Sequence, residues 1–564
     1  MLRAFNTLYA EYEIIKNLKF KTTFSYDYTT VKGEKWYDPR TSNGEDENGE
    51  VVKRIREYKK MVWSNTLSYL TTFNNIHHLD FLAGYEIDDT YNDYLSGEAY
   101  NFTTPDKHAI SNGMKTVSVG GSDSRYRLVS YLSRLNYDYK NKYYLGASFR
   151  VDGSSRLHRD NRWGTFWSVS GAWRTIEEEF MQPVKDWLTD LRIRASYGVN
   201  GTLPSDYFGY MGLSSISGGY LEQPGIQMSQ IANPNLKWET NYNMNIGLDF
   251  GFWDRLNFTI EYYTRTTKNL LMDCPVSMTT GFSSYLMNIG EVKNKGIELT
   301  INSTNIKIKD FNWNTTFNLG HNSNKVVKLD GEQTQIVSGT QIHKVGSSYR
   351  TFYVQEFAGI NPETGNPLFY TNELDENGNY IKEITENSKN AQFIPYKHAE
   401  PTVNGGISNS LRYKWLDLNF LFSYQFGGYS YDTWAQKTEH GGYDSYANIP
   451  TYYRDSWKKP GDQTNIEVYM PGKSSSVSMH KITSSRRIHS TDYFRLKNIT
   501  FGITLPKEWT NKINIGNVRF YASASNLWTW AAYDNYDPEA VSAGSATQTT
   551  PPLKTVTFGL NINF

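Results

Sequence analysis

Alternation of apolar and polar residues over segments of about ten residues constrains the fold of this chain more than any other feature. In residues 239–250 one face carries Tyr242, Met244, Ile246, Leu248 and Phe250, and the other carries Asn241, Asn243, Asn245, Gly247 and Asp249. Residues 190–199, 311–320 and 554–564 repeat the pattern. Because consecutive side chains of a strand point to opposite sides, each segment predicts a strand with one apolar face. About ten residues is also the length that a tilted strand needs to cross a bilayer.

Composition agrees with a large all-β protein. The 28 Phe, 43 Tyr, 15 Trp and 43 Gly residues favour strands and turns. The 58 Lys and Arg residues balance 58 Asp and Glu residues, so a basic nucleic-acid binder is not expected. The mean hydropathy is −0.61 and no stretch approaches the roughly 18 apolar residues of a membrane helix. The single cysteine, Cys274, provides neither an internal disulfide nor a cysteine-based zinc site.

The lengths of the connections decide between two all-β architectures. The expected strands are 6–15, 18–29, 56–72, 76–87, 126–138, 142–151, 164–174, 190–199, 237–250, 255–265, 295–304, 311–321, 347–360, 367–371, 401–411, 415–426, 493–505, 517–530 and 555–564. Short connections such as 73–75 and 139–141 alternate with long ones such as 88–125 and 427–492. A soluble sandwich has no reason to alternate in this way, whereas outer-membrane barrels have short periplasmic turns and long outer loops. The sequence therefore predicts a transmembrane antiparallel β-barrel.

The count of about 19 strands would make the first strand run from the outside to the periplasm. Bacterial single-chain barrels have an even number of strands and start from the periplasm. Residues 1–20 also begin almost directly with a strand and show no charged n-region, apolar h-region and cleavage site. We therefore expect the sequence to lack the first part of the barrel.

Several motifs carry a family resemblance. They are YLSRLNYDYKNKYYLGASFRVDGSSR (131–156), RWGTFWSVSGAWRTIEEEFM (162–181), LRIRASYGVNG (191–201), NPNLKWET (233–240), MNIGEVKNKGIELTINS (287–303), GINPETGNP (359–367), YFRLKNITFGITLP (493–506) and VRFYASASNLWTW (518–530). With these motifs in this order, the chain resembles the C-terminal barrel portion of the SusC/RagA-like TonB-dependent outer-membrane transporters of Bacteroidetes. The resemblance implies about 19 of 22 barrel strands, with the N-terminal plug and first strands absent, and Phe564 as the outer-membrane assembly signal.

The resemblance also implies a function and partners. It implies import of glycan oligosaccharides or peptides across the cell outer membrane, with a SusD-like surface lipoprotein over the outer mouth. The TonB–ExbB–ExbD complex would act through the missing plug region, and outer-membrane lipid would surround the barrel. Neither catalysis nor a cofactor is expected, because a transporter works by differential binding and gating.

Four arginines are expected to line the lumen. Arg192 and Arg194 lie on the polar face of their strand, and an arginine at the lipid midplane would cost about 2–4 kcal/mol. Arg134 and Arg150 are interpreted in the same way. Structural pairing with the plug is the first interpretation, and a role in substrate passage is the alternative.

The whole chain, 1–564, is expected to be one barrel domain with a long extracellular aromatic-rich loop at 427–492. The candidate substrate contacts of this loop are Tyr429, Tyr431, Trp434, Tyr443, Tyr446, Tyr452, Tyr453 and Trp457. Flat aromatic faces among adaptable polar groups suit recognition, and sugar rings stack on such faces. The alternative is that these aromatic residues pack the loop onto itself or onto a partner.

No metal site is predicted. Residues 375–379 (DENGN) superficially resemble a calcium loop but lack the later bidentate Glu, and His77 and His78 point to opposite faces of a strand. Two other functional classes stay open. One is an unplugged or adhesive outer-membrane barrel, and the other is a soluble all-β carbohydrate-binding protein or glycosidase, in which the apolar faces would be buried against each other.

Overall fold

The computed structural model describes residues 1–220, 223–329, 334–442, 448–471, 482–513, 515–546 and 549–563. Seventeen strands belong to one large antiparallel sheet, which confirms the all-β class. These strands are β1 (Leu2–Ile15), β2 (Leu18–Tyr37), β3 (Glu50–Phe73), β4 (His77–Phe102), β5 (Gly113–Tyr139), β6 (Tyr143–Ser154), β7 (Trp163–Trp173), β8 (Leu188–Thr202), β11 (Glu239–Phe252), β12 (Leu256–Lys268), β15 (Glu291–Lys307), β16 (Phe311–Lys328), β26 (Val403–Tyr413), β27 (Leu416–Phe426), β30 (Tyr493–Thr504), β31 (Asn517–Ala531) and β34 (Thr555–Asn563). The α-helices of the described residues are α1 (Thr433–Thr438) and α2 (Lys507–Thr510). None of them is long and apolar enough to span a membrane.

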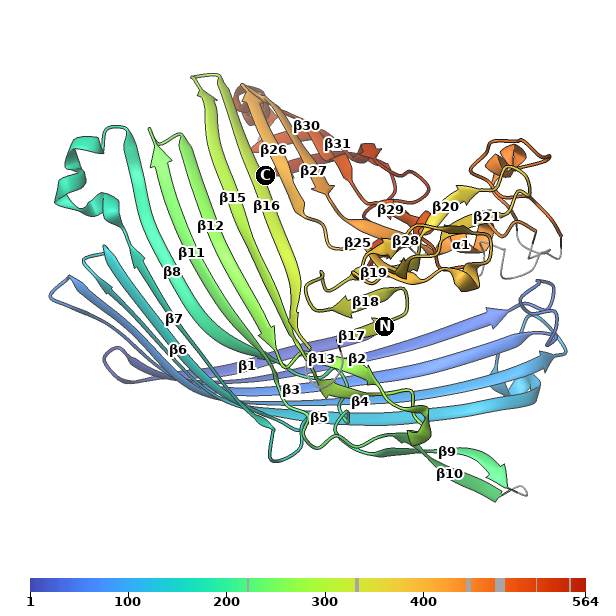
Figure 1. Ribbon diagram of the computed structural model, residues 1–564. Coiled ribbons are helices and arrows are strands. Elements are labelled where there is room, and N and C mark those ends of the chain that lie inside the picture. Colours follow the sequence, from blue (N-terminus) through green and yellow to red (C-terminus); the bar gives the residue numbers. More distant parts are fainter. Residues whose placement is uncertain are drawn as a thin grey trace. The chain divides into compact units, whose positions relative to one another are not determined.

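Contacts divide the chain into two compact units. One comprises Met1–Arg174, Arg194–Met244 and Thr267–Ile289, and the other comprises Thr175–Ile193, Asn245–Thr266 and Gly290–Phe564. In the first unit, strands β1 to β7 pair in sequence order as an antiparallel meander (Figure 1). In the second unit, β15, β16, β26, β27, β30, β31 and β34 pair in the same way.

Tight turns join the strands at the short connections. Asn74 and Asn75 have φ of 53° and 59°, Lys140 and Asn141 have 55° and 53°, and Trp253 and Asp254 have 51° and 54°. Each turn is closed by a backbone hydrogen bond from the fourth residue to the first, as in Ile76 N to Phe73 O at 3.1 Å. Two successive left-handed residues form a type I′ turn, whose twist matches that of the flanking strands. Local backbone chemistry therefore fixes these hairpins.

Two of the nineteen expected strands do not belong to the large sheet. The segment 347–360 holds β19 (Thr351–Gln355) and β20 (Phe357–Ile360), and 367–371 holds β21 (Pro367–Tyr370). These strands pair within small sheets of four and three strands. Their alternating pattern has another cause, because Phe352 and Val354 of β19 are fully buried in a core of protein side chains. In the described residues the large sheet thus has 17 strands where about 19 were predicted, and β16 and β26 are joined by one long connection, 329–402.

Several strands are longer than the sequence suggested. Strands β2 to β5 cover most of the connections predicted at 30–55 and 88–125. In these extensions charged residues pair across neighbouring strands, as where Arg125 contacts Asp89 at 2.5 Å. Strand ends that carry polar residues on both faces lack the period-two hydrophobic signal, so the sequence does not reveal them.

The apolar faces of the long strands are exposed. On β34, Val556, Phe558, Leu560 and Ile562 are 59%, 80%, 51% and 40% exposed. On β6, Leu145 and Phe149 are also exposed. A soluble sandwich would bury these faces against a second sheet, whereas a membrane barrel turns them toward lipid. The exposure therefore favours the barrel interpretation.

Candidate functional site

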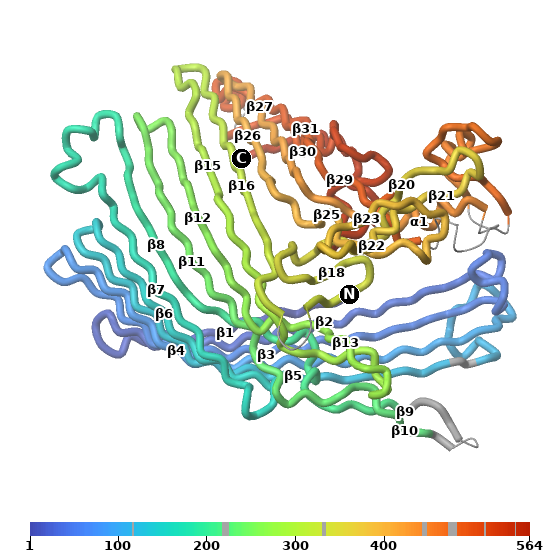
Figure 2. Tube along the Cα trace, in the orientation of Figure 1, coloured from blue at the N-terminus to red at the C-terminus, as the bar shows by residue number. Residues whose placement is uncertain are grey.

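The candidate site lies where two long connections meet. The connection between β27 and β30 spans 427–492 and holds β28 (Tyr429–Asp432), α1 and β29 (Ile488–Ser490). Strand β28 pairs antiparallel with β29 and parallel with β33 (Ser545–Ala546). Because β33 lies in the connection 532–554 between β31 and β34, the two connections share one small sheet. The trace of this part of the chain is coloured orange to red in Figure 2.

Asp432 organises this junction. Its Oδ1 accepts hydrogen bonds from the backbone N–H groups of Trp434 (3.0 Å) and Ala435 (2.8 Å), so it caps α1. Its Oδ2 accepts a hydrogen bond from the Tyr533 hydroxyl at 2.9 Å. Burial raises the pKa of Tyr533, and the negative charge of Asp432 raises it further. The cap places Trp434 in the first turn of the helix with a fixed backbone.

A stacked pair of aromatic rings lies beside Asp432. The rings of His489 and Tyr533 lie 3.7 Å apart at 3° to each other. Burial lowers the pKa of His489 to about 4, so the imidazole is neutral at pH 7. A neutral ring can stack on Tyr533 without bringing a further charge beside the carboxylate.

Trp434 opens onto a pocket of about 450 Å³. The pocket is lined by Asp432, Trp434, Asn535, Tyr536, Asp537 and Thr549, among others. The Trp434 side chain is 46% exposed, which leaves a flat apolar surface beside hydroxyl, amide and carboxylate groups. Such a surface suits a ligand with one apolar face and several hydroxyl groups.

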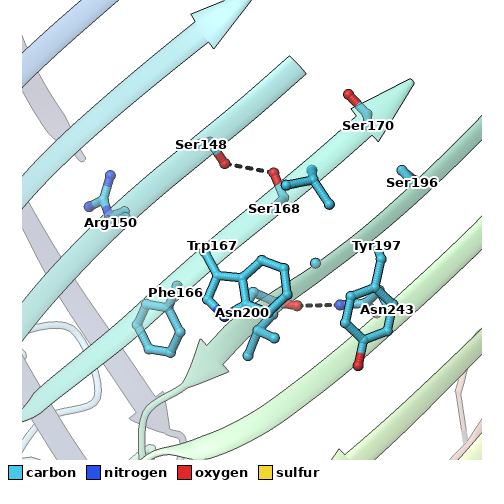
Figure 3. Close-up of a pocket in the computed structure, with 13 residues that line it drawn as sticks. Ser148, Arg150, Phe166, Trp167, Ser168, Ser170, Ser196, Tyr197, Asn200 and Asn243 are labelled. Carbon is cyan, nitrogen blue, oxygen red and sulfur yellow. Dashed lines mark hydrogen bonds between the residues drawn. The ribbon is translucent and has the colours of Figure 1, made fainter. Parts of the chain in front are cut away.

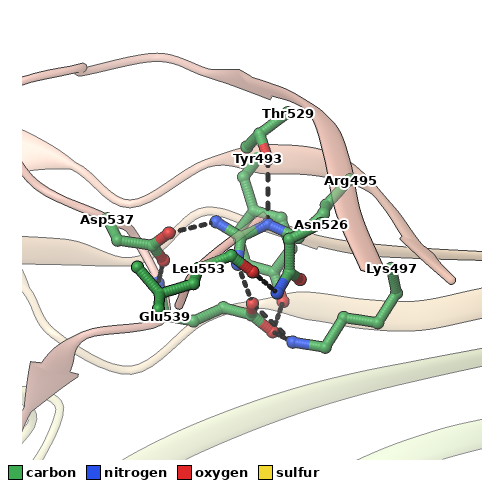
Figure 4. A network of polar contacts seen from close by, with 8 residues as sticks. All are labelled: Tyr493, Arg495, Lys497, Asn526, Thr529, Asp537, Glu539 and Leu553. Atoms are coloured by element: carbon green, nitrogen blue, oxygen red, sulfur yellow. Dashed lines mark hydrogen bonds and ion pairs between the residues drawn. The ribbon is translucent and has the colours of Figure 1, made fainter. Parts of the chain in front are cut away.

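A buried arginine holds one wall of the pocket (Figure 4). Arg495 of β30 is 1% exposed and donates from Nη2 to Asp537 Oδ2 at 2.5 Å. Its Nη1 contacts Glu539, and its Nε donates to Thr529 Oγ1 at 3.0 Å. Lys497 Nζ also binds Glu539, at 2.7 Å. The network therefore fixes the acidic residues of the connection 532–554 on β30, while Thr529 of β31 holds Arg495 in place.

The structure separates the predicted aromatic residues into two groups. Tyr431 and Tyr453 are 1% and 4% exposed, and Tyr431 packs against Phe352 and Val354. These contacts support the alternative interpretation, in which the aromatic residues pack the connection. Trp434 remains a predicted substrate contact.

The other predicted aromatic residues have mixed positions. Tyr429 and Tyr452 are half-buried; Lys397 lies over the Tyr429 ring and the Tyr452 hydroxyl binds Glu439. Trp457 donates from Nε1 to Pro362 O at 2.7 Å, which ties 427–492 to the preceding long connection. Tyr443 and Tyr446 lie outside the described residues, as does Phe564.

Arg134, Arg150 and Arg192, three of the predicted lumen arginines, contact carboxylates. Arg134 lies 3.1 Å from Asp80, and Arg150 donates from Nε to Asp152 at 2.7 Å. Arg192 donates from Nε to Asp249 at 3.0 Å, and Arg194 lies on the same face of β8. These carboxylates belong to the large sheet itself, so pairing of the arginines with a plug and their lumenal position both stay predictions.

The sequence did not reveal another pocket, on strands β6, β7, β8 and β11, where hydroxyl and amide groups lie beside the rings of Phe166, Trp167 and Tyr197 (Figure 3). The pocket, of about 420 Å³, is lined by Ser148, Ser168 and Asn243 among others. The hydroxyls of Ser148 and Ser168 are 2.6 Å apart, and Asn243 Nδ2 donates to Asn200 Oδ1 at 2.6 Å. Small hydroxyl residues at alternate positions of neighbouring strands were the available signal. In the described part of the chain, no group of three or more His, Cys, Asp or Glu residues is placed to hold a metal ion.

Comparison with known proteins identifies the family. Residues 3–381 match the family described as TonB dependent receptor-like, beta-barrel. The chain belongs to this TonB-dependent receptor family. It is 32% identical over 587 residues to TonB-dependent receptor P3 of Formosa agariphila, covering 99% of this chain and 57% of that protein. It is 29% identical over 541 residues to TonB-dependent receptor SusC of Bacteroides thetaiotaomicron, covering 92% of this chain and 51% of SusC.

Solved structures agree with this assignment. This chain matches a chain of the structure of the RagAB peptide transporter with a TM-score of 0.88 and 26% identity. The match covers 100% of this chain and 62% of that one. The chain is therefore a SusC/RagA-like TonB-dependent receptor barrel of the outer membrane, which confirms the predicted fold class, family and location. The family consists of receptors and transporters rather than enzymes. The chain spans between about half and two thirds of the length of these relatives.

Proposed function

We propose that this chain is the barrel part of a TonB-dependent transporter that imports glycan oligosaccharides across the outer membrane. Membership of the TonB-dependent receptor family supports nutrient import in general. The similarity to SusC and to the RagAB peptide transporter leaves two substrate classes to be compared, glycans and peptides.

The Trp434 pocket favours a glycan over a peptide as the substrate. Its exposed indole offers a stacking surface for a sugar ring. Its two carboxylates already accept hydrogen bonds from the protein: Asp432 from Trp434, Ala435 and Tyr533, and Asp537 from Arg495 and the backbone of Glu539. A neutral ligand with many hydroxyl groups fits such a pocket better than a peptide terminus, which requires a free opposite charge.

The partners follow from the same proposal. A SusD-like surface lipoprotein assists capture at the outer mouth, and the TonB–ExbB–ExbD complex supplies energy through a plug region. The long connections 329–402 and 427–492 provide the surface for capture. The lumen arginines contribute the polar interior against which a plug packs.

Trp434→Ala tests the proposal. We expect weaker binding of neutral oligosaccharides by the detergent-purified protein and slower TonB-dependent uptake in cells, with normal insertion into the outer membrane. Trp509→Ala is the matched control, because Trp509 is 61% exposed on α2, at the short connection between β30 and β31. Unchanged affinity and uptake in Trp434→Ala would contradict a role for this pocket.

The alternative of an unplugged or adhesive barrel has its own signature. Such a protein would bind surfaces through its long connections, and its presence would not make glycan uptake depend on TonB. Uptake that is the same in cells with and without TonB would therefore favour this alternative.

A further inference from the structure

The long connection 329–402 contains a further pocket, of about 520 Å³. It is built on the small sheet of β17 (Gln335–Ser338), β18 (Gln341–Lys344), β19 and β25 (Phe393–His398), together with the hairpin of β22 (Glu373–Leu374) and β23 (Tyr380–Ile381). The side chains that matter here are Gln335, Tyr353, Asn372, Tyr380, Gln392 and Phe393. None of them was singled out by the sequence.

Three aromatic rings from three strands contribute to this pocket. The ring centroids of Tyr353 and Phe393 lie 5.5 Å apart with an interplanar angle of 35°. Phe393 is 41% exposed and Tyr380 is 42% exposed. The pocket therefore presents apolar faces to solvent, although the connection also has buried cores in which aromatic rings could pack. Exposed aromatic faces in a concave site are typical of ligand contact.

The buried side-chain amide of Asn372 also points to a ligand. It is 1% exposed, and its Nδ2 donates to Glu356 Oε2 at 3.2 Å, while Lys382 binds the same carboxylate. Because the amide nitrogen must face Glu356, the orientation of the amide is settled and Oδ1 takes the other side. Within the described residues this Oδ1 has no hydrogen-bond partner although it is buried. A buried carbonyl oxygen requires a donor, and a hydroxyl group of a bound molecule can supply it.

Charge and hydrogen-bonding capacity select the kind of molecule. Gln335 and Gln392 are exposed amides that can both donate and accept, as vicinal hydroxyl groups require. Lys344 and Glu373 carry opposite charges at the pocket, so the pocket has no net charge that favours an anionic or a cationic ligand. Neutral hydroxyl groups and an apolar ring face satisfy all of these side chains together.

We propose that this pocket is a subsite for one sugar ring of a neutral oligosaccharide, separate from the Trp434 pocket. The subsite rests on the proposed glycan import and extends it to a second point of contact. The ring stacks on Phe393 and a hydroxyl group donates to Asn372 Oδ1. A hydrogen bond from Trp457 to Pro362 O joins the connections that carry the two pockets.

Phe393→Ala tests the subsite, with Tyr396→Ala as the matched control. Both residues lie on β25 and are 41% and 40% exposed, but only Phe393 lines the pocket. An array of neutral glycans identifies the ligand of the unaltered protein, and calorimetry then measures each variant. We expect about tenfold weaker binding in Phe393→Ala and no change in Tyr396→Ala.

Asn372→Gly provides a second, independent variant. Asn372 has φ of 52°, which glycine adopts without strain, so the change removes the amide while keeping the backbone. We expect weaker binding of the same glycan and a modestly lower unfolding midpoint, because the hydrogen bond from Asn372 to Glu356 is lost as well.

Each outcome separates the two proposals. Equal affinity of Phe393→Ala and Tyr396→Ala, with glycan binding and uptake intact, overturns the subsite alone. Binding of peptides from a protein digest that Phe393→Ala abolishes overturns the sugar assignment of the pocket. If the unaltered protein binds no neutral glycan of the array, both the subsite and the proposed glycan import fail.

Discussion

Arg495 Nη2 lies 2.5 Å from Asp537 Oδ2, so a guanidinium that is 1% exposed joins a barrel strand to the wall of the Trp434 pocket. Glu539 shares the same guanidinium and also binds Lys497. Hydrogen bonds between an arginine and carboxylates are short, directional and strong when water is excluded. The pocket wall therefore depends on a residue of β30 that does not line the pocket itself.

Arg495→Met should release the connection 532–554 from the barrel strands. Removing one partner of a buried ion pair typically costs about 3–5 kcal/mol, because the carboxylates are left without their cation. Hydrogen exchange followed by mass spectrometry should show faster exchange in 532–546 with unchanged protection of β30 and β31.

Arg519→Met is the control for this substitution. Arg519 pairs with Asp417 at 2.6 Å but is 26% exposed, and it contacts no part of the connection 532–554 in the interactions of the described residues. Protection of 532–546 in Arg495→Met equal to that in Arg519→Met would refute the anchoring role.

Arg156→Ala should loosen the connection 203–238. The guanidinium of Arg156 lies 4.0 Å from the centroid of the Tyr126 ring and 4.4 Å from that of Tyr207, and its Nη1 donates to Pro204 O at 3.0 Å. A cation between two aromatic rings is worth about 0.5–2 kcal/mol for each ring. Limited proteolysis should cleave the variant within 203–212 at a lower protease concentration. Arg159→Ala, which removes a 79% exposed arginine, should leave the cleavage pattern unchanged.

Acidification should weaken the packing around His489. Burial lowers its pKa to about 4 from an ordinary value near 6.5, so between these two values the unfolded chain binds more protons than the folded one. The stabilisation is complete above about pH 6.5 and falls by about 1.4 kcal/mol for each pH unit below it. Hydrogen exchange in 482–492 should therefore accelerate between pH 6.5 and pH 4.5 beyond the chemical effect of pH. His489→Gln should remove this additional dependence, and a dependence that persists in the variant would assign it to another group.

Gly405→Ala should destabilise the pairing of β26 and β27. Gly405 lies opposite Tyr424, whose hydroxyl crosses it to donate to Asn318 O at 2.9 Å. A Cβ atom on Gly405 would lie 2.1 Å from Asn318 O and 2.5 Å from the Tyr424 hydroxyl. Forcing such an atom into a packed site costs about 1–3 kcal/mol. The change should therefore lower the midpoint of urea unfolding, which is measured by the heat-modifiable mobility of the barrel on a gel. Gly33→Ala is the control, since no atom lies within 4 Å of its added Cβ, and an equal effect of both changes would contradict the packing argument.

The sequence alone determined the strand class, the alternation of faces and the bounds of the connection 427–492. Residues 239–250 encode their own two faces, because the period of a strand is a local property of the backbone. The bounds 427–492 of the aromatic connection also coincide with the end of β27 and the start of β30. Trp434 could be named as a candidate because exposed aromatic residues in a long polar loop form a local compositional signal.

Only the tertiary structure decided which aromatic residues are available and what holds them. Tyr431 and Trp434 are three residues apart and look equivalent in the sequence, yet one is 1% exposed and the other 46%. The difference arises from Phe352 and Val354, about 80 residues away in the chain, which bury Tyr431. Distant contacts also decide the place of β19, whose sequence pattern resembles that of a barrel strand. They likewise decide the role of Arg495 on β30, whose partners Asp537 and Glu539 come from the connection 532–554. Contacts between distant segments depend on how the chain folds back on itself, and no local pattern records them.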